Sequence, residues 1–388
     1  MTQTFSTRTI CCKLLFDEAS AAAIRATAEA FNAAATYCAS VAWEERITNK
    51  NKLHHVVYGP TRSEYGLGAQ LACCARDKAA EAVRAARANG SDTCPTFKPN
   101  SSMRYDARTY RLMSMDRVSL NTITGRVMGQ LVLGEYQRRH LYDTSWKIGG
   151  AELVQRDGQF YLHITQTKVN PDPDEPTGFL GVDLGIVNLA TDSDGETFSG
   201  EQVKQVRERW FKHRRRLQKT NTRRARWRLR QRARKEQRVQ KDVNHRISKK
   251  LVTKAKMERK ALALEELTHI RTRTDNGWRR SQRRLRTSWA FRQLRTFIGY
   301  KAAQAGVLVM TVDPRNTSRT CAVCGYGDKQ NRKTQSHFCC RSCGHTAAAD
   351  TNAAVTSAYR AGCQPAYGAA PLSSGGASTS PGASALGS

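Results

Sequence analysis

The chain of 388 residues lacks long apolar runs and has few acidic residues. No segment approaches the roughly 20 consecutive apolar residues that cross a bilayer, and Met1 to Ile10 lacks the apolar core of a signal peptide. These absences predict a cytoplasmic protein without a membrane partner. Asp and Glu number 33 against 64 Lys and Arg, which gives a formal net charge of +31. This excess favours a polyanionic partner, because cations neutralise phosphates and release counterions.

Nucleic acid is the favoured polyanion. An acidic membrane surface competes with it, but the basic residues do not form a juxtamembrane cluster. Arg207 to Arg238 contains 16 Lys or Arg and two acids. A charge run is usually a solvated face, yet one this one-sided would repel itself unless an anion lay along it. The segment therefore predicts nucleic-acid contacts, with these candidate side chains: Arg214, Arg215, Arg216, Arg223, Arg224, Arg226, Arg228 and Arg230.

Aromatic residues are sparse but interleave with this charge. Trp210, Phe211 and Trp227 could pack on a sheet or stack on bases, and the sequence leaves both open. Thr272 to Arg295 is a second basic stretch. The aromatic residues expected to belong to the core rather than to a binding surface are Trp289, Phe291 and Phe297.

The N-terminal half reads as a strand, then helices, then more strands. Thr7 to Phe16 is β-rich, and Asp17 to Arg87 is Ala-rich with helical periodicity interrupted around Asn49 to Gly68, which predicts two or three helices. From Pro95 to Val169 short β-like segments alternate with turns, including a hairpin through Arg156-Asp-Gly158. This order predicts a small β-barrel interrupted by a helical domain.

The C-terminal half alternates strands with helices, which predicts an α/β sheet. Gly178 to Phe198 is expected to form two strands around a turn at Asp192 to Glu196. The tail from Ala361 has no charged residue and is predicted to be disordered. The other expected elements are a long helical region over 202–260 that breaks near Thr220-Asn-Thr222, buried strands at 261–264 and 307–312, and a helix over 288–305.

Two cysteine pairs stand out among the 12 cysteines, the rest of which are expected to be reduced thiols. Cys321-Ala-Val-Cys324-Gly and Cys340-Arg-Ser-Cys343-Gly have the spacing of zinc knuckles, and two such pairs make a closed tetrahedral structural site for Zn²⁺. Cys339 is a rival ligand, but only Cys340 has both the spacing to Cys343 and a glycine after the pair. The nearby histidines, expected to be exposed, are His337 and His345.

Three isolated carboxylates lie in small, apolar settings. They are Asp183 in Gly-Val-Asp-Leu-Gly, Glu265 in Ala-Leu-Ala-Leu-Glu, and Asp350 after the second knuckle. Each alone is more simply a cap or a salt-bridged acid, but the three together indicate a metal site. Hard cations such as Mg²⁺, with Mn²⁺ as an alternative, take oxygen ligands. Two such ions about 3.5–4 Å apart can hydrolyse a phosphodiester by activating water and neutralising the leaving oxygen. The three acids therefore predict a nuclease.

These motifs carry a family resemblance. Gly181 to Thr191 (GVDLGIVNLAT) resembles the first motif of RuvC-like nuclease domains, and Leu262 to Arg271 (LALEELTHIR) resembles the second. The two knuckles with Asp350-Thr-Asn-Ala-Ala354 resemble the zinc finger and the third motif. This set resembles the transposon-encoded TnpB family (OrfB-like RNA-guided nucleases), which is related to type V CRISPR effectors. The resemblance is specific over residues 178–354. Before residue 178 it rests only on the order of a strand, helices and further strands.

The resemblance implies an RNase H-like α/β fold, a bound guide RNA and cleavage of target DNA beside a short recognised motif. It implies catalytic roles for Asp183, Glu265 and Asp350, and its pattern selects Glu265 over Glu266, which strand alternation alone does not settle. Asp242 to Ser248 also resembles a family pattern, but a lone helical His245 is more often structural and is left out of the site. The implied location is the prokaryotic cytoplasm, associated with the nucleoid.

The implied domains are a β-barrel wedge domain (1–16 and 95–175), a helical recognition domain (17–94), a RuvC-like nuclease domain (176–360) with a zinc-finger insertion (317–347), and the tail (361–388). The protein is expected to act as a monomer or as a homodimer on the RNA. Three alternatives stay open: an RNA-guided DNA-binding repressor without cleavage, a compact type V CRISPR effector, and a protein-only transposase or junction resolvase.

Overall fold

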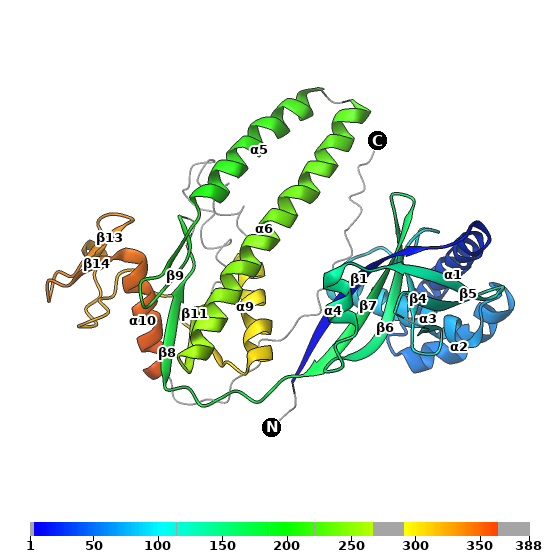
Figure 1. Ribbon diagram of the computed structural model, residues 1–388, viewed down its shortest axis with the longest axis horizontal. Helices are drawn as coiled ribbons and strands as arrows, with labels where there is room; N and C mark the ends of the chain where they lie inside the picture. The colour runs from blue at the N-terminus through cyan, green and yellow to red at the C-terminus, as the bar shows by residue number, and fades with distance from the viewer. Residues whose placement is uncertain (1–3, 114, 186, 221, 267–290, 364–388) are drawn as a thin grey trace. The chain divides into compact units, whose positions relative to one another are not determined.

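The chain forms two compact units, which meet in the sequence at Val169 and Asn170. A computed structural model (Figure 1) describes residues 4–113, 115–185, 187–220, 222–266 and 291–363. Most of the predicted second basic stretch and almost all of the predicted tail lie outside these residues. Within the described ranges, no helix is both long and apolar enough to span a membrane.

The first unit contains a seven-stranded antiparallel sheet that curls into a nearly closed barrel. Its two edge strands, β2 (Met103–Tyr105) and β3 (Tyr110–Leu112), are separated by only the four residues 106–109. The Tyr110 hydroxyl donates to the Gly149 carbonyl of β6 (2.6 Å), and the Tyr105 hydroxyl donates to the Asn121 carbonyl of β4 (3.1 Å). The edges are therefore drawn together. The strands, in sheet order, are β2 (Met103–Tyr105), β6 (Lys147–Arg156), β7 (Gln159–Val169), β1 (Phe5–Leu15), β5 (Gly125–Val132), β4 (Arg117–Thr122) and β3 (Tyr110–Leu112).

The predicted hairpin joins β6 to β7. Its two loop residues, Asp157 and Gly158, both have positive φ (51° and 77°). A two-residue turn of this kind matches the right-handed twist of the strands, and Asp-Gly is a preferred pair for it. The local sequence therefore fixes the register of β6 and β7, two of the three longest strands of the barrel.

Three helices, α1 (Glu18–Glu44), α2 (Lys50–Ser63) and α3 (Ala69–Ala88), lie between β1 and β2 in the sequence, and α4 (Glu135–Leu141) follows β5. The expectation that helical structure is interrupted over 49–68 is wrong, because α2 fills most of that range. Asn49 caps it by accepting from the backbone N–H groups of Asn51 (2.8 Å) and Lys52 (3.3 Å). Buried residues at i, i+4 and i+8 give this polar segment its apolar stripe: Leu53, Val57 and Thr61.

The second unit contains a mixed five-stranded sheet in the order β10-β9-β8-β11-β12. β8 (Gly178–Asp183), β11 (Lys260–Glu265) and β12 (Val309–Val312) are parallel, while β9 (Asn188–Asp192) and β10 (Thr197–Ser199) continue from β8 as an antiparallel meander. The expected pair of strands over 178–198 is therefore three strands. The additional turn follows Asp183, and Gly185 accommodates it, since a Cβ there would lie 2.7 Å from the Asn188 carbonyl oxygen.

Helices cover both faces of this sheet. α5 (Glu201–Thr220) and α6 (Arg223–Met257) form a long antiparallel hairpin (Figure 1), and the last part of α6 packs with α9 (Phe291–Ala305) on Leu180 and Val182 of β8. The opposite face receives α10 (Ala349–Cys363), which lies along β8. Neighbouring residues of β8 therefore face different helices, as strand alternation requires.

Gly181 sets the distance between α10 and the sheet. A Cβ at this position would overlap the Ala354 carbonyl oxygen and lie 2.8 Å from the Ala358 nitrogen. Both obstacles are helix backbone, which cannot rotate away as a side chain can. The small residues of α10 complete this close approach, and the ones buried against the sheet and its surroundings include Ala353, Ala354, Ser357 and Ala361.

We predict that Gly181→Ala destabilises the protein by about 1–3 kcal/mol or more, the usual range for overpacking. Thermal unfolding of the purified protein measures the effect. Gly178→Ala is the matched control, because a Cβ at this other end of β8 meets nothing within 4 Å. Equal melting temperatures for the two variants would contradict the proposed backbone contact.

Candidate active site and zinc centre

Two of the predicted acids end neighbouring parallel strands. Asp183 is the last residue of β8 and Glu265 the last residue of β11. The register pairs Ala263 with Gly181 and Leu264 with Val182, so one further step sets Glu265 beside Asp183. Adjacent strands lie about 4.8 Å apart. The two carboxylates therefore leave the same edge of the sheet on the same face.

The third acid comes from the helix on that face. Asp350 is the second residue of α10, and its carboxylate accepts from Asn188 Nδ2 (2.9 Å) and Arg332 Nη2 (3.3 Å). Repulsion from both Glu265 and Asp350 acts on Asp183. The structure therefore brings together the three acids that the sequence singled out from segments far apart in the chain.

The two adjacent glutamates of β11 have different environments. Glu265 is buried and faces α10, where it accepts from Ser357 Oγ (3.4 Å). Glu266 points to the other side and forms a two-pronged ion pair with Arg295 of α9 (2.5 and 2.7 Å). Leu262 and Leu264 face α6 and α9, whereas Ala263 packs on the α10 side. Both faces of β11 are thus buried, which is why alternation of apolar residues could not choose between the glutamates.

Burial disfavours the charged forms of Asp183 and Glu265, and repulsion from neighbouring acids adds to this effect at Asp183. Burial, followed by the charges of Glu265 and Asp350, raises the pKa of Asp183 to about 8. Burial also raises the pKa of Glu265. A cation placed among the carboxylates would relieve this repulsion, because an opposite charge favours the ionised form. The acids therefore suit a positively charged ligand.

One further oxygen belongs to this site. Thr191 of β9 is paired in register with Asp183, so the two side chains share a face. Its Oγ1 is buried and has no hydrogen-bond partner. A buried hydroxyl without a partner is costly unless water or an ion completes it. Three carboxylates and this hydroxyl are all oxygen donors, the ligand type that Mg²⁺ and Mn²⁺ take. The carboxylate oxygens of the three acids do not all lie within 4.8 Å of one another.

Several residues that hold the acids were not predicted from the sequence. Arg332, between the two knuckles, binds both Asp350 and the Gln335 carbonyl oxygen (2.7 Å). Asn352 of α10 accepts from the Ala322 N–H (3.1 Å) and donates to the Thr320 carbonyl (2.8 Å), which fastens the first knuckle to the start of the helix. Asn352 lies within the quoted third motif, and its burial is the signal that separates this role from a surface position.

The four predicted cysteines converge. Cys321, Cys324, Cys340 and Cys343 form, among the described residues, the only group of three or more His, Cys, Asp or Glu whose ligand atoms all lie within 4.8 Å. The Sγ atoms of Cys321 and Cys343 are 3.7 Å apart, and those of Cys324 and Cys340 are 3.5 Å apart. Four sulfurs at about 2.3 Å from a tetrahedral Zn²⁺ would be separated by about 3.8 Å. The cluster therefore fits one zinc ion.

The two knuckles have the same backbone design. In the first, Gly325 N–H donates to the Cys321 carbonyl (3.0 Å), and in the second Gly344 N–H donates to the Cys340 carbonyl (3.1 Å). Both glycines have positive φ (74° and 73°), a conformation that side chains rarely adopt. Hydrogen bonding to the backbone N–H of Cys343 is the largest influence that lowers the pKa of the Cys340 thiol, to about 6, which favours the thiolate that binds metal.

The rival residues lie outside the cluster. Cys339 is exposed at the end of β13 (His337–Cys339), which pairs with β14 (Thr346–Ala348). Alternation along β13 buries Phe338 and directs Cys339 to the other side. Cys340, the next residue along the chain, is buried and takes part in the cluster.

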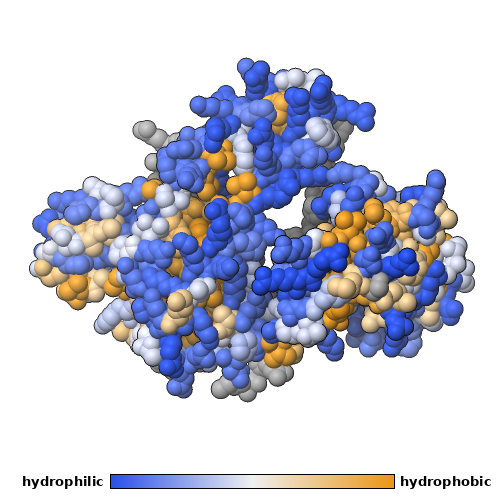
Figure 2. Space-filling view, viewed as in Figure 1, coloured by the Kyte–Doolittle hydropathy of each residue, from blue (hydrophilic) through white to orange (hydrophobic). Residues whose placement is uncertain are grey.

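The basic hairpin is exposed along both helices. All eight candidate arginines are exposed, and Arg214 of α5 pairs with Glu236 of α6 (2.7 Å). Figure 2 shows the upper part of the molecule, where the hairpin lies, as mainly hydrophilic. The aromatic residues separate into two classes: Trp210 is buried, whereas Trp227 is 56% exposed. The ring of Phe211 lies beneath the Arg215 guanidinium (6.0 Å).

His245 belongs to the packing between α6 and α9. Its ring stacks on Phe297 (4.1 Å between centroids), and the Tyr300 hydroxyl lies 3.3 Å from Nδ1. Lys301 Nζ donates to the His245 carbonyl (2.6 Å). Burial, with the nearby charge of Lys301, lowers the pKa of His245 to about 4, so the ring is neutral at pH 7. These contacts agree with a structural histidine.

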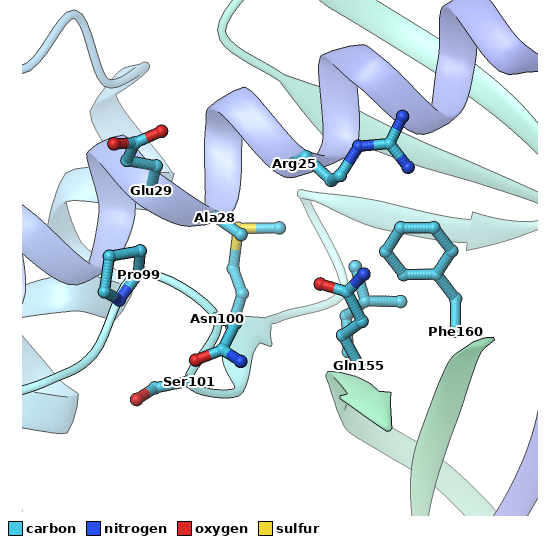
Figure 3. Close-up of a pocket in the computed structure, with 10 residues that line it drawn as sticks. Arg25, Ala28, Glu29, Pro99, Asn100, Ser101, Gln155 and Phe160 are labelled. Atoms are coloured by element: carbon cyan, nitrogen blue, oxygen red, sulfur yellow. The ribbon is translucent and has the colours of Figure 1, made fainter. Parts of the chain in front are cut away.

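A hollow in the first unit is a different kind of site (Figure 3). It lies between α1 and the barrel, and Arg25, Glu29, Asn100, Gln155 and Phe160 are arranged around it. This lining contains one carboxylate and no cysteine or histidine. It therefore offers hydrogen-bonding groups but no constellation for metal-assisted hydrolysis, which points to the second unit for the chemistry.

Comparison with known proteins supports the resemblance seen in the motifs. Residues 161–270 match the OrfB_IS605 family, described as a probable transposase, and residues 291–356 match the Cas12f1-like TNB domain. TnpB-like protein MJ0751 of Methanocaldococcus jannaschii is 28% identical over 210 residues, which cover 50% of this chain and 73% of that protein. The resemblance to the TnpB family is confirmed.

Other proteins similar to this chain carry nuclease names. The CRISPR-associated endodeoxyribonuclease Cas12f1 of Sulfoacidibacillus thermotolerans is 42% identical over 113 residues, 29% of this chain and 25% of that protein. InsQ of Escherichia coli strain K12, whose name describes an RNA-guided DNA endonuclease, is 28% identical over 243 residues, 57% of this chain and 59% of that protein. The alignments thus span less than two thirds of both of these relatives.

The fold is shared with a solved structure. The Cas12f1–sgRNA–target DNA complex contains a chain that superposes with a TM-score of 0.64 at 15% sequence identity, covering 89% of this chain and 83% of that one. The mixed α/β architecture with its curled sheet therefore resembles Cas12f1.

We predict that the purified protein contains one zinc ion per chain and that Cys340→Ser abolishes it, since each thiolate supplies one of four ligands. Elemental analysis measures the metal content. Cys339→Ser, the neighbouring substitution outside the cluster, should retain the full content. Retention of zinc by the Cys340 variant, or its loss from the Cys339 variant, would overturn the ligand assignment.

We also predict that Asp183→Asn flattens the dependence of stability on pH. The folded-state pKa near 8 lies above the ordinary value of 3.8, so the folded protein binds the proton more tightly. Without added divalent cations, wild-type stability should then fall as pH rises from about 4 to 8. Thermal unfolding across this range should show a smaller fall for the variant, whereas Asp174→Asn, which removes an exposed acid, should follow the wild type.

Mg²⁺ should raise the melting temperature of the wild type but not that of Asp183→Asn.

Proposed function

We propose that this chain is an RNA-guided, metal-dependent DNA endonuclease, associated with a transposon, that cleaves target DNA next to a short recognised motif. The observation that carries the proposal is the meeting of Asp183, Glu265 and Asp350 at one edge of the second sheet. RNA guidance and DNA as the substrate are supported by the names of InsQ and Cas12f1 and by the TnpB resemblance.

The reaction we propose is phosphodiester hydrolysis at the three carboxylates. When bound, two divalent ions would supply an activated water and neutralise the leaving oxygen. Asp183, Glu265 and Asp350 would hold those ions. Arg332, which donates to Asp350, would fix that carboxylate's orientation, and the Ser357 hydroxyl would do the same for Glu265. These contacts are available before substrate arrives, which lowers the cost of organising the site.

The remaining parts have proposed roles of their own. The exposed arginines of α5 and α6 would contact phosphates of the guide and target, while base pairing with the guide would supply sequence specificity. The curled sheet would act as the wedge domain, the α1–α3 segment as the recognition domain, and residues 176–360 as a RuvC-like nuclease domain carrying the zinc finger. The protein would act as a monomer or homodimer on its RNA in the bacterial or archaeal cytoplasm, at the nucleoid.

Two neighbouring functions are distinguishable from this one. A repressor that binds DNA without cutting it has no need for three acids on one face, and their joint presence favours the nuclease. A compact CRISPR effector would use the same site with a guide transcribed from a repeat array. Sequencing the RNA that co-purifies with the protein separates these origins, and the absence of a discrete RNA would remove the guided mechanism in favour of a protein-only nuclease.

We predict that Glu265→Gln lowers the rate of guided plasmid cleavage by about 100-fold or more, since it removes a charged metal ligand without changing the shape of the side chain. Glu266→Gln is the matched control one residue away and should cleave at close to the wild-type rate, because Glu266 lies on the opposite face of β11 and pairs with Arg295. Gel analysis of plasmid cleavage with the co-purified RNA measures both. Asp183→Ala should be inactive as well, and full activity in that variant would contradict the proposed active site.

A further inference from the structure

The outer face of α6 near the tip of the hairpin combines one large exposed ring with several cations. Trp227 is 56% exposed, although tryptophan is among the residues that gain most from burial. Other aromatic residues of the hairpin are more sheltered, since Trp210 is buried and Phe211 is half-buried. Trp227 is therefore not explained by the packing of α5 against α6.

Helix geometry sets the neighbours of this ring. The side of α6 that faces α5 is marked by buried Ala225 and by Glu236, which pairs with Arg214. At 100° per residue, Trp227 lies about 200° from Ala225, on the opposite side. The arginines that share this outer side by their spacing are Arg223, Arg224, Arg230, Arg234 and Arg238.

These positions form a ladder along the helix. From Arg223 to Arg238 it extends about 22 Å at 1.5 Å per residue. Arg223, Arg230 and Arg238 are exposed, and Trp227 follows the first of them by one turn. Guanidinium groups bind phosphates, and an indole offers a flat face of the size of a base. The combination of a cationic track with a single exposed ring matches a strand whose phosphates follow the track while one base stacks on the ring.

A continuous duplex would leave Trp227 without a function. The bases of a duplex already stack on one another, so their faces are covered everywhere except at the two ends of the duplex. A protein partner would need a pocket for the ring within an acidic surface that matches the ladder. An unpaired nucleotide supplies both the negative charge and the free aromatic face.

We propose that the outer face of α6 binds a segment of nucleic acid with unpaired bases, and that Trp227 stacks on one of those bases. The site would take a single strand, or the unpaired end of a duplex, of either RNA or DNA. This inference rests on the proposed function, because it names the form of nucleic acid that one surface of the same protein accepts.

The test uses the full chain, freed of nucleic acid by a high-salt wash, with fluorescein-labelled 12-nucleotide probes. Trp227→Ala should weaken binding of single-stranded RNA or DNA by about 5- to 100-fold, the loss expected for one stacked base. Trp227→Phe, which keeps an aromatic face, should recover most of the affinity. Binding of a blunt 12-base-pair duplex should change by less than about threefold. Whichever single strand shows the larger loss identifies RNA or DNA as the source of the unpaired base.

Salt dependence separates stacking from charge. Trp227→Ala should leave the slope of log affinity against log salt unchanged, because no phosphate contact is lost. Arg230→Ala, one turn away, should reduce that slope by about 0.7, the value for one phosphate of a single strand. A 2-aminopurine in the probe should lose fluorescence on binding to the wild type and to Trp227→Phe, and much less on binding to Trp227→Ala.

Three outcomes would overturn the inference: unchanged affinity in Trp227→Ala, an equal loss for single strand and duplex, or a lowered melting temperature that accounts for the loss. These binding measurements involve no cleavage. If Trp227→Ala binds normally while Glu265→Gln fails to cut, the nuclease proposal stands and only the stacking site is wrong. If stacking is observed but Glu265→Gln cuts normally, the stacking site stands and the proposed nuclease site is wrong.

Discussion

The second unit depends on a contact between backbones, that of Gly181 with the helix α10. The absence of a side chain on β8 lets the helix lie against the strand, with the Ala354 carbonyl where a Cβ would be. Because α10 is rigid, this contact also determines where its first turn lies, and that turn carries Asp350. A wider separation would move Asp350 away from Asp183 and Glu265, so the spacing among three acids follows from the smallest residue in the strand.

The cysteine cluster supports the same helix at its first turn. Asn352 joins the first knuckle to α10 through two hydrogen bonds, and Arg332 reaches from between the knuckles to Asp350. With zinc bound, the first knuckle would be a fixed point that holds the turn of α10 that carries Asp350. Loss of the metal should therefore loosen the position of Asp350, because metal binding and local folding are coupled in such sites.

The sequence predicted the features that depend on residues close together in the chain, but not those that depend on tertiary packing. The knuckles follow from the spacing of residues within one turn, and the β6–β7 hairpin follows from Asp157-Gly158. Strand alternation alone could not separate Glu265 from Glu266, because helices cover both faces of β11. Arg332 and Thr191 have no local signature, because their importance comes from neighbours distant in the chain. The helix α2 was missed because its buried stripe has few apolar residues among many polar ones.

The order of the strands has a consequence for how the chain folds. β8 and β11 are hydrogen-bonded neighbours, yet 76 residues, from Leu184 to Arg259, lie between them, including the whole α5–α6 hairpin. Closing so long a connection costs conformational entropy, and this cost is incurred before the contacts between the two strands can compensate it. Topologies with such pairings therefore fold slowly. Like charges crowded in that loop add repulsion as the strands approach. Asp350 follows Glu265 by a further 85 residues, so the three acids cannot meet on a nascent chain until the start of α10 has emerged from the ribosome.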